Sequence, residues 1–204
     1  MNRLSVLICG LLLGVVCISC SEKSEEEEFS NWENRNVAYL DSIAKVAKAN
    51  SDGSWTIYKA YTLGDSTAIY NGHNDRFIFV KKLEHGNGAM HPLFSDSVRV
   101  HYSGRLIPTK TYVNGYCFDK SYVSDTLNVK TDVPALFGVK GNIVGFATAL
   151  QYMVEGDKWL VYIPYQLGYG KQDAQSIPAY STLIFEMTLA KIYRQGEYLS
   201  TEWH

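Results

Sequence analysis

The chain is poor in cysteine, and the few cysteines that it has are unevenly placed. Three of the four lie within the first twenty residues, and only Cys117 lies beyond them. The body of the protein therefore cannot form an internal disulfide unless one of the early cysteines survives and folds back. No neighbouring motif supplies a base that would activate a nucleophilic thiol, so we interpret Cys117 as a small strand or loop residue.

The sequence also lacks an excess of positive charge and a cluster of metal ligands. With 19 Lys and Arg against 21 Asp and Glu, the formal net charge is -2, which argues against a nucleic-acid partner. Two carboxylates flank a glycine at 155–157, and we interpret Glu155 and Asp157 as solvated turn residues. We expect no metal site and no cofactor, because these histidines are scattered without ligand spacing: His73, His85, His91, His101 and His204.

What the sequence does contain is ordinary globular composition with many tyrosines. Apolar residues make up 46% of the chain and charged residues 20%, and the length of 204 residues gives room for one domain and an extension. There are 15 tyrosines against 8 phenylalanines. A ring that carries a hydroxyl suits a half-buried position, so this excess favours a binding surface.

The amino terminus begins with a short apolar segment. Residues 4–16 follow the basic Arg3 and are too few for a stable transmembrane helix. The segment ends with Ser19 and Cys20, a small residue directly before a cysteine. This pattern resembles the signal of bacterial lipoproteins, in which the cysteine becomes the lipidated first residue. We therefore expect a signal peptide over 1–19 and a lipid anchor on Cys20, in preference to a plain secretory signal with an incidental cysteine.

An acidic stretch over 20–28 follows this signal. Beyond Cys20 it contains no apolar side chain, so mutual repulsion and the lack of anything to bury make it a solvated tether. It resembles the export signal of surface lipoproteins of the Bacteroides group, and a plain spacer is an equally weighted alternative. We expect a protein of the bacterial cell envelope, lipid-anchored to the outer membrane, with surface exposure left open.

Residues 29–75 form an amino-terminal extension of a helix and a strand. A capping box at 30–33 predicts the start of the helix, and the turn formers at 50–53 predict its end. Between them, apolar residues keep helical spacing: Val37, Leu40, Ala44 and Ala47. We predict a strand over 55–63 and a loop over 64–75. We interpret the extension as an accessory element packed on its own domain, in preference to a dimerisation arm, and leave the oligomeric state open.

A helix, a turn and two strands form the centre of the predicted domain, residues 76–195. Alternating residues predict strands over 159–163 and 183–189, and the loop 165–180 between them carries Tyr169 beside glycines. Before the turn, apolar residues recur at spacings of three and four, which predicts a short helix with one buried face: Ile143, Phe146, Leu150 and Met153.

The earlier part of this domain predicts more strands. Residues 77–83 and 97–106 are the stronger ones, and 116–121 is an edge strand or a bulge. Five or six antiparallel strands and one short helix predict an α+β fold.

Several short motifs occur in order along this domain. They are VRVHYSGRL at 98–106, FDKS at 118–121, GNIVGF at 141–146, EGDKW at 155–159, IP at 163–164, LGYG at 167–170, IP at 177–178 and STLIFE at 181–186. Together they resemble the FKBP-type peptidyl-prolyl isomerase domain, over about 115 residues.

The resemblance implies a twisted antiparallel β-sheet wrapped around one short α-helix, with an apolar pocket between them. In this family the hydroxyl of Tyr169 donates to a substrate carbonyl, the backbone N–H of Ile177 holds a neighbouring carbonyl, and Asp119 with Tyr102 orients the site. The implied pocket walls are Tyr102, Phe118, Asp119, Ile143, Phe146, Tyr169, Ile177 and Phe185.

Phenylalanines and one isoleucine carry the apolar part of the expected site. The resemblance implies that the proline ring would be received by Phe118, Phe146 and Phe185. Pattern alone favours simple core packing for Phe185, Ile143 and Phe146, and the resemblance reverses this in favour of the pocket.

The sequence departs from the family pattern at three positions. Phe146 stands where the family usually has tryptophan, Asn142 replaces an aliphatic residue, and Val133 lies near the position of another pocket aromatic. These departures would widen or wet the pocket, which bears on the catalytic rate more than on the fold.

We predict a membrane-tethered prolyl isomerase that acts on proline-containing segments of exported proteins. The alternative is a non-catalytic peptide-binding or chaperone lipoprotein that keeps the fold and an apolar groove. A third possibility is a structural lipoprotein subunit whose pocket binds one fixed peptide.

Overall fold

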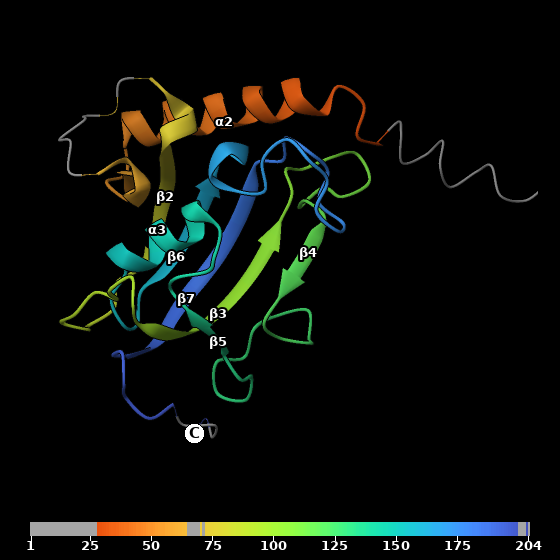
Figure 1. Cartoon of the computed structure of the whole chain (residues 1–204). Coiled ribbons are helices and arrows are strands. Elements are labelled where there is room, and N and C mark those ends of the chain that lie inside the picture. Colours follow the sequence, from red (N-terminus) through yellow and green to blue (C-terminus); the bar gives the residue numbers. More distant parts are fainter. Residues whose placement is uncertain (1–27, 65–69, 71, 200–202, 204) are drawn as a thin grey trace, which may run out of the picture. The chain divides into compact units, whose positions relative to one another are not determined.

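The computed structural model describes residues 28–64, 70, 72–199 and 203 (Figure 1). The chain divides into two compact units, Met1–Ser30 and Asn31–His204. The predicted signal peptide, Cys20 and residues 21–27 of the tether lie outside the described residues. Within the described part of the chain, no helix is both long enough and apolar enough to cross a membrane.

The predicted amino-terminal helix is present as α2, Trp32–Ala49, but it starts differently from expectation. Its N-cap is Asn31, in a left-handed conformation with φ 53°, and the Asn31 side chain makes no capping hydrogen bond. The helix therefore begins one residue later than the capping box at 30–33 predicts. The end was predicted correctly: Asn50 closes the helix, and its Oδ1 accepts a hydrogen bond of 2.8 Å from the N–H of Trp55.

All strand pairs of the sheet are antiparallel, so the α+β prediction is confirmed. The sheet has seven strands in the order β1-β2-β6-β7-β3-β4, and β5 pairs with β3 beside this path. The strands are β1 Trp55–Lys59, β2 Phe77–Glu84, β3 Ser97–Arg105, β4 Cys117–Lys120, β5 Ala135–Gly138, β6 Lys158–Ile163 and β7 Leu183–Tyr193.

Two of these strands differ from the predictions. Strand β5 was not predicted from the sequence. Strand β1 is shorter than the predicted 55–63 because a 3-10 helix, Tyr61–Leu63, replaces its end. Since β1 pairs with β2, the extension adds an edge strand to the sheet of the predicted domain.

The two helices cover opposite faces of the sheet where β6 passes beneath them. Tyr162 belongs to the buried cluster that includes Leu40 and Ala44 of α2. The next residue, Ile163, lies against the second helix, α3, Val144–Tyr152, at Gly145. Because consecutive strand residues point to opposite faces, α2 and α3 lie on different sides of β6.

The approach of α3 to the sheet requires glycine at one position. A Cβ atom built on Gly145 would overlap the side chain of Ile163, so a larger residue would push the helix away. Neighbouring residues of α3 are buried, including Phe146 at 4% exposure and Leu150 at 0%. This contact fixes the depth at which Phe146 sits below the surface.

The carboxylates of the 155–157 turn hold tertiary hydrogen bonds, and that of Asp157 is buried, contrary to the prediction of solvated turn residues. Asp157 is 4% exposed, and its two oxygens accept hydrogen bonds of 2.9 Å from the N–H groups of Gly86 and Val154. Glu155 accepts from the N–H of Ile192 at 2.7 Å. The turn therefore ties the loop after β2 to the end of β7, a role set by tertiary contacts.

Candidate functional site

One pocket of about 210 Å³ gathers nearly all the residues that the sequence analysis assigned to a site. It lies where α3 faces strands β3, β4, β5 and β7. Of the predicted wall residues only Ile177 is missing from its lining, which consists of Tyr102, Phe118, Asp119, Phe137, Gly141, Asn142, Ile143, Phe146, Tyr169 and Phe185. The roles of these residues in binding or catalysis stay predictions.

Strand register brings the pocket residues of three strands together. On β3, Gly104 pairs with Asp119 of β4 on one side and with Phe185 of β7 on the other. A Cβ atom at Gly104 would lie 2.6 Å from the Phe118 ring and 2.7 Å from the Phe185 ring. The missing side chain of Gly104 is therefore the space that these two rings fill, a role that the sequence analysis did not assign.

Phe146 is a buried residue of the pocket lining and packs against the edges and faces of other rings. Its ring centroid lies 6.0 Å from Tyr102, 5.8 Å from Phe137 and 5.2 Å from Phe185, and all three pairs are close to perpendicular. Phe118 meets Phe185 in the same way at 5.6 Å. Edge-to-face contacts of this kind stabilise by about 0.5–1.5 kcal/mol each beyond the area that they bury.

The pocket contains an aromatic residue that was not predicted, Phe137. It lies on β5 and lines the pocket, whereas Val133 is 57% exposed and is not part of the lining. Phe137 was overlooked because β5 was not predicted. The signal that could have revealed it is the run Ala-Leu-Phe between Pro134 and Gly138, a short apolar segment bounded by strand-ending residues.

Asn142 lines the pocket, and its amide group also supports the turn before α3. Its Nδ2 donates to the carbonyl of Gly138 at 2.6 Å and to that of Val139 at 3.3 Å. The amide thus links the end of β5 to the start of the helix, so this departure from the family pattern has a structural use.

The polar groups of the pocket centre on one carboxylate. The hydroxyl of Tyr102 donates to Asp119 Oδ2 at 2.6 Å. Burial and this hydrogen bond raise the pKa of Tyr102 well above its ordinary value. Burial, and to a lesser extent the charge of Asp119, also raise the pKa of Tyr169, which is 46% exposed. Both hydroxyls therefore keep their protons near neutral pH and are able to donate.

Ile177 is not part of the pocket lining. It is 5% exposed, and its backbone N–H donates to the carbonyl of Ala174 at 2.9 Å. Its expected hydrogen bond to a substrate carbonyl would have to replace this internal bond, and that role stays a prediction.

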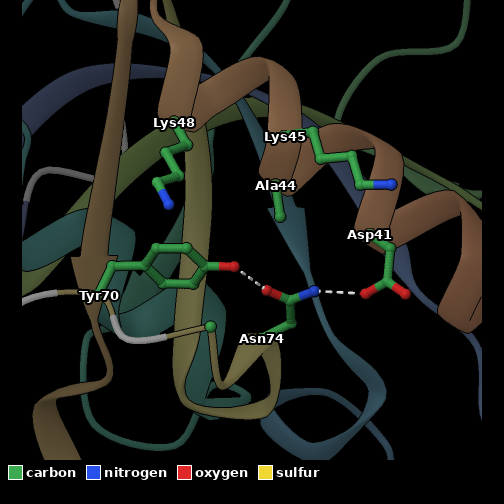
Figure 2. Close-up of a pocket in the computed structure, with 7 residues that line it drawn as sticks. Asp41, Ala44, Lys45, Lys48, Tyr70 and Asn74 are labelled. Carbon is green, nitrogen blue, oxygen red and sulfur yellow. Dashed lines mark hydrogen bonds between the residues drawn. The ribbon is translucent and has the colours of Figure 1, made fainter.

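A second, larger hollow of about 440 Å³ lies between the carboxyl-terminal half of α2 and the residues Tyr70, Gly72 and Asn74 (Figure 2). The hydroxyl of Tyr70 donates to Asn74 Oδ1, and Asn74 Nδ2 donates to Asp41 at 2.6 Å. Lys45 and Lys48 complete the lining from the helix. None of the predicted site residues lies here, and its amide and tyrosine groups already bond to one another.

The described residues include no group of three or more His, Cys, Asp or Glu side chains that could hold a metal ion. What the first pocket offers instead is a small cavity with aromatic walls, a hydrogen bond from the buried Tyr102 to the exposed Asp119, and a second tyrosine, Tyr169, in its lining. An arrangement of this kind binds an apolar ring and fixes nearby amide groups by hydrogen bonds.

An antiparallel sheet that packs on a helix around an aromatic pocket is the architecture of a known protein family. The model of the family "FKBP-type peptidyl-prolyl cis-trans isomerase" matches residues 88–190. The chain belongs to this family, which confirms the resemblance stated from the sequence motifs.

Individual relatives agree with the family. The FKBP-type 22 kDa peptidyl-prolyl cis-trans isomerase of Escherichia coli is 42% identical over 111 residues, which cover 54% of this chain and 47% of that protein. FkpA of Buchnera aphidicola subsp. Schizaphis graminum is 31% identical over 187 residues, or 90% of this chain and 68% of the relative. The chain thus spans about half the length of the first relative and about two thirds of the length of the second.

A solved structure shows the same fold. The crystal structure of FkpA from Escherichia coli aligns with a TM-score of 0.57 at 25% sequence identity, over 85% of this chain and 67% of that one. The sheet and the helix that form the pocket are therefore family features.

Gly104→Ala should disturb the pocket and the fold together. The added methyl group would overlap the Phe118 and Phe185 rings, and overpacking of this kind costs about 1–3 kcal/mol. Chemical denaturation should show this loss in the free energy of unfolding. A matched control is Gly138→Ala, where the methyl group would meet only the carbonyl oxygen of Lys140 at 3.3 Å. Equal losses in the two variants would contradict the packing described here.

Proposed function

We propose that this protein is a peptidyl-prolyl cis-trans isomerase that acts on X–Pro bonds of polypeptides. The observation that carries the proposal is the pocket with Phe146 in its lining and the Tyr102–Asp119 pair in its wall. Its volume of about 210 Å³ suits one proline ring, since pockets for drug-sized ligands measure about 300–1,000 Å³.

The chemistry needs no nucleophile and no metal. Rotation about a peptide bond faces a barrier of about 18–20 kcal/mol because resonance gives the bond double-bond character. For X–Pro bonds both isomers are populated, but exchange takes tens to hundreds of seconds at about 25 °C. The planar amide is charge-separated and well solvated, whereas the twisted state loses its resonance. A pocket with aromatic walls, which solvate the planar amide less well than water does, favours the twisted state relative to the planar one.

The polar groups would then set the geometry of the bound chain. Tyr169 lines the pocket, where its protonated hydroxyl would donate to a substrate carbonyl. Asp119 holds the hydroxyl of Tyr102 at 2.6 Å and keeps it directed along the wall. These groups would orient the twisting amide, and none of them has to exchange a proton with it.

The cis-to-trans rate of a short X–Pro peptide tests this proposal. The protein should accelerate isomerisation, and Tyr169→Phe should lower kcat/KM about two- to tenfold, the effect of one lost hydrogen bond. Asp119→Ala should lower it at least as much, because the Tyr102 hydroxyl also loses its acceptor. Tyr198→Phe is the matched control, since Tyr198 is 84% exposed and lies outside the pocket.

A folded protein that gives no acceleration would contradict the isomerase proposal. It would then favour the alternative, a non-catalytic peptide-binding or chaperone module. Phe146 is the observation behind this alternative, because a phenylalanine at this position fills less of the pocket than the tryptophan usual in the family. Suppression of client aggregation, measured on the same preparation, would support it.

We further propose that the protein is lipid-anchored through Cys20 to the outer membrane, where it acts on exported polypeptides. Support comes from the sequence alone: the apolar run 4–16, the small residue before Cys20 and the acidic tether. Cys20→Ser should move the protein from the membrane fraction to the soluble fraction of lysed cells. An unchanged distribution would rule out the lipid anchor. Removal of the domain by protease added to intact cells would place it on the surface.

A further inference from the structure

The first half of α2 contacts the loop that precedes β7. The indole Nε1 of Trp32 donates to Ser181 Oγ at 2.8 Å. The side chain of Asn36 accepts from the N–H of Thr182 at 2.7 Å, and its Nδ2 donates to the carbonyl of Trp32 at 2.8 Å. In Figure 1 the loop between β6 and β7 lies near the amino-terminal end of α2.

These contacts are buried, so their loss would be costly in free energy. Asn36 is 0% exposed and Thr182 is 1% exposed. A buried backbone N–H without a partner is costly, and a buried amide side chain is tolerated only when it is hydrogen-bonded. The Asn36 side chain meets both needs, because it supplies the acceptor for Thr182 and finds its own acceptor in the helix.

The segment held by α2 leads directly to the pocket. Tyr180 stands one residue before Ser181, and its N–H donates to the carbonyl of Gly170 at 2.9 Å. The Tyr180 ring also meets the Tyr165 ring edge-on at 5.2 Å. Gly170 directly follows Tyr169, and its own N–H donates to the carbonyl of Tyr165 at 2.9 Å. A continuous set of contacts therefore runs from the helix to the backbone beside Tyr169.

We propose that Trp32 and Asn36 are positioning residues of the isomerase site. By fixing residues 180–182 they hold the loop that places Tyr169 over the pocket. The helix that carries them lies outside residues 88–190, the part that the family model matches, so the extension is a working part of the site and not the accessory element expected from the sequence. The proposal rests on the proposed isomerase activity and deepens it.

The second half of α2 provides the contrast that a test needs. Ile43 is half-buried and packs against the buried cluster that includes Trp55, Phe77 and Tyr162 on the sheet. It makes none of the hydrogen bonds to residues 180–182. Ile43→Ala should therefore destabilise the docking of the same helix without releasing the loop beside Tyr169.

The experiment compares Asn36→Ala, Trp32→Phe and Ile43→Ala in the full chain, with two readouts at a temperature where each variant is folded. The first is amide hydrogen exchange at Gly170 and Tyr180, and the second is kcat/KM for an X–Pro peptide. Asn36→Ala should raise exchange at these amides about tenfold and lower kcat/KM about fivefold or more. Trp32→Phe removes only one donor, so it should change both readouts in the same direction by less.

The outcomes separate the proposal from simple stabilisation. Wild-type exchange and kcat/KM in both Asn36→Ala and Trp32→Phe would overturn it, as would equal effects of Ile43→Ala on both readouts. If the wild-type protein proves inactive, the proposed function fails. The exchange at Gly170 and Tyr180 then still decides whether the helix positions the loop.

Discussion

The close contact between α3 and β6 at Gly145 is the constraint on which the pocket depends. Because no side chain separates the helix from Ile163, the next residue, Phe146, reaches deep enough to meet rings from β3, β5 and β7. These contacts turn the space under the helix into a cavity lined by aromatic rings. Gly104 plays the matching part in the sheet, since its missing side chain leaves room for Phe118 and Phe185.

The sequence predicted the elements that carry a clear period or a dense motif. The helix around Phe146 and the strands around Tyr102 and Phe185 were found because apolar residues recur at helical or strand spacing. The residues of the pocket were found through the order of the family motifs. Both kinds of signal are local in the chain, and the structure brings all the predicted wall residues except Ile177 into one lining.

What the sequence could not predict depends on contacts between distant segments. Asp157 looked like a solvated turn residue, yet its carboxylate accepts from Gly86, 71 positions away. Gly104 acquires its role from the register of three strands, and Asn36 acquires its role from an N–H that is 146 positions away. The β5 strand was missed because four residues are too few for a period to stand out.

Catalysis by the proposed isomerase is a change in the environment of the amide and not a proton transfer. Tyr102 and Tyr169, whose pKa values are both raised, keep their protons, and Asp119 is occupied as the acceptor of Tyr102. The measurement that tests this most directly is kcat/KM for an X–Pro peptide in H₂O and in D₂O. We expect a ratio of about 1, because no proton is transferred at the transition state. A ratio of about 2 or more would indicate general acid–base catalysis and would contradict the account.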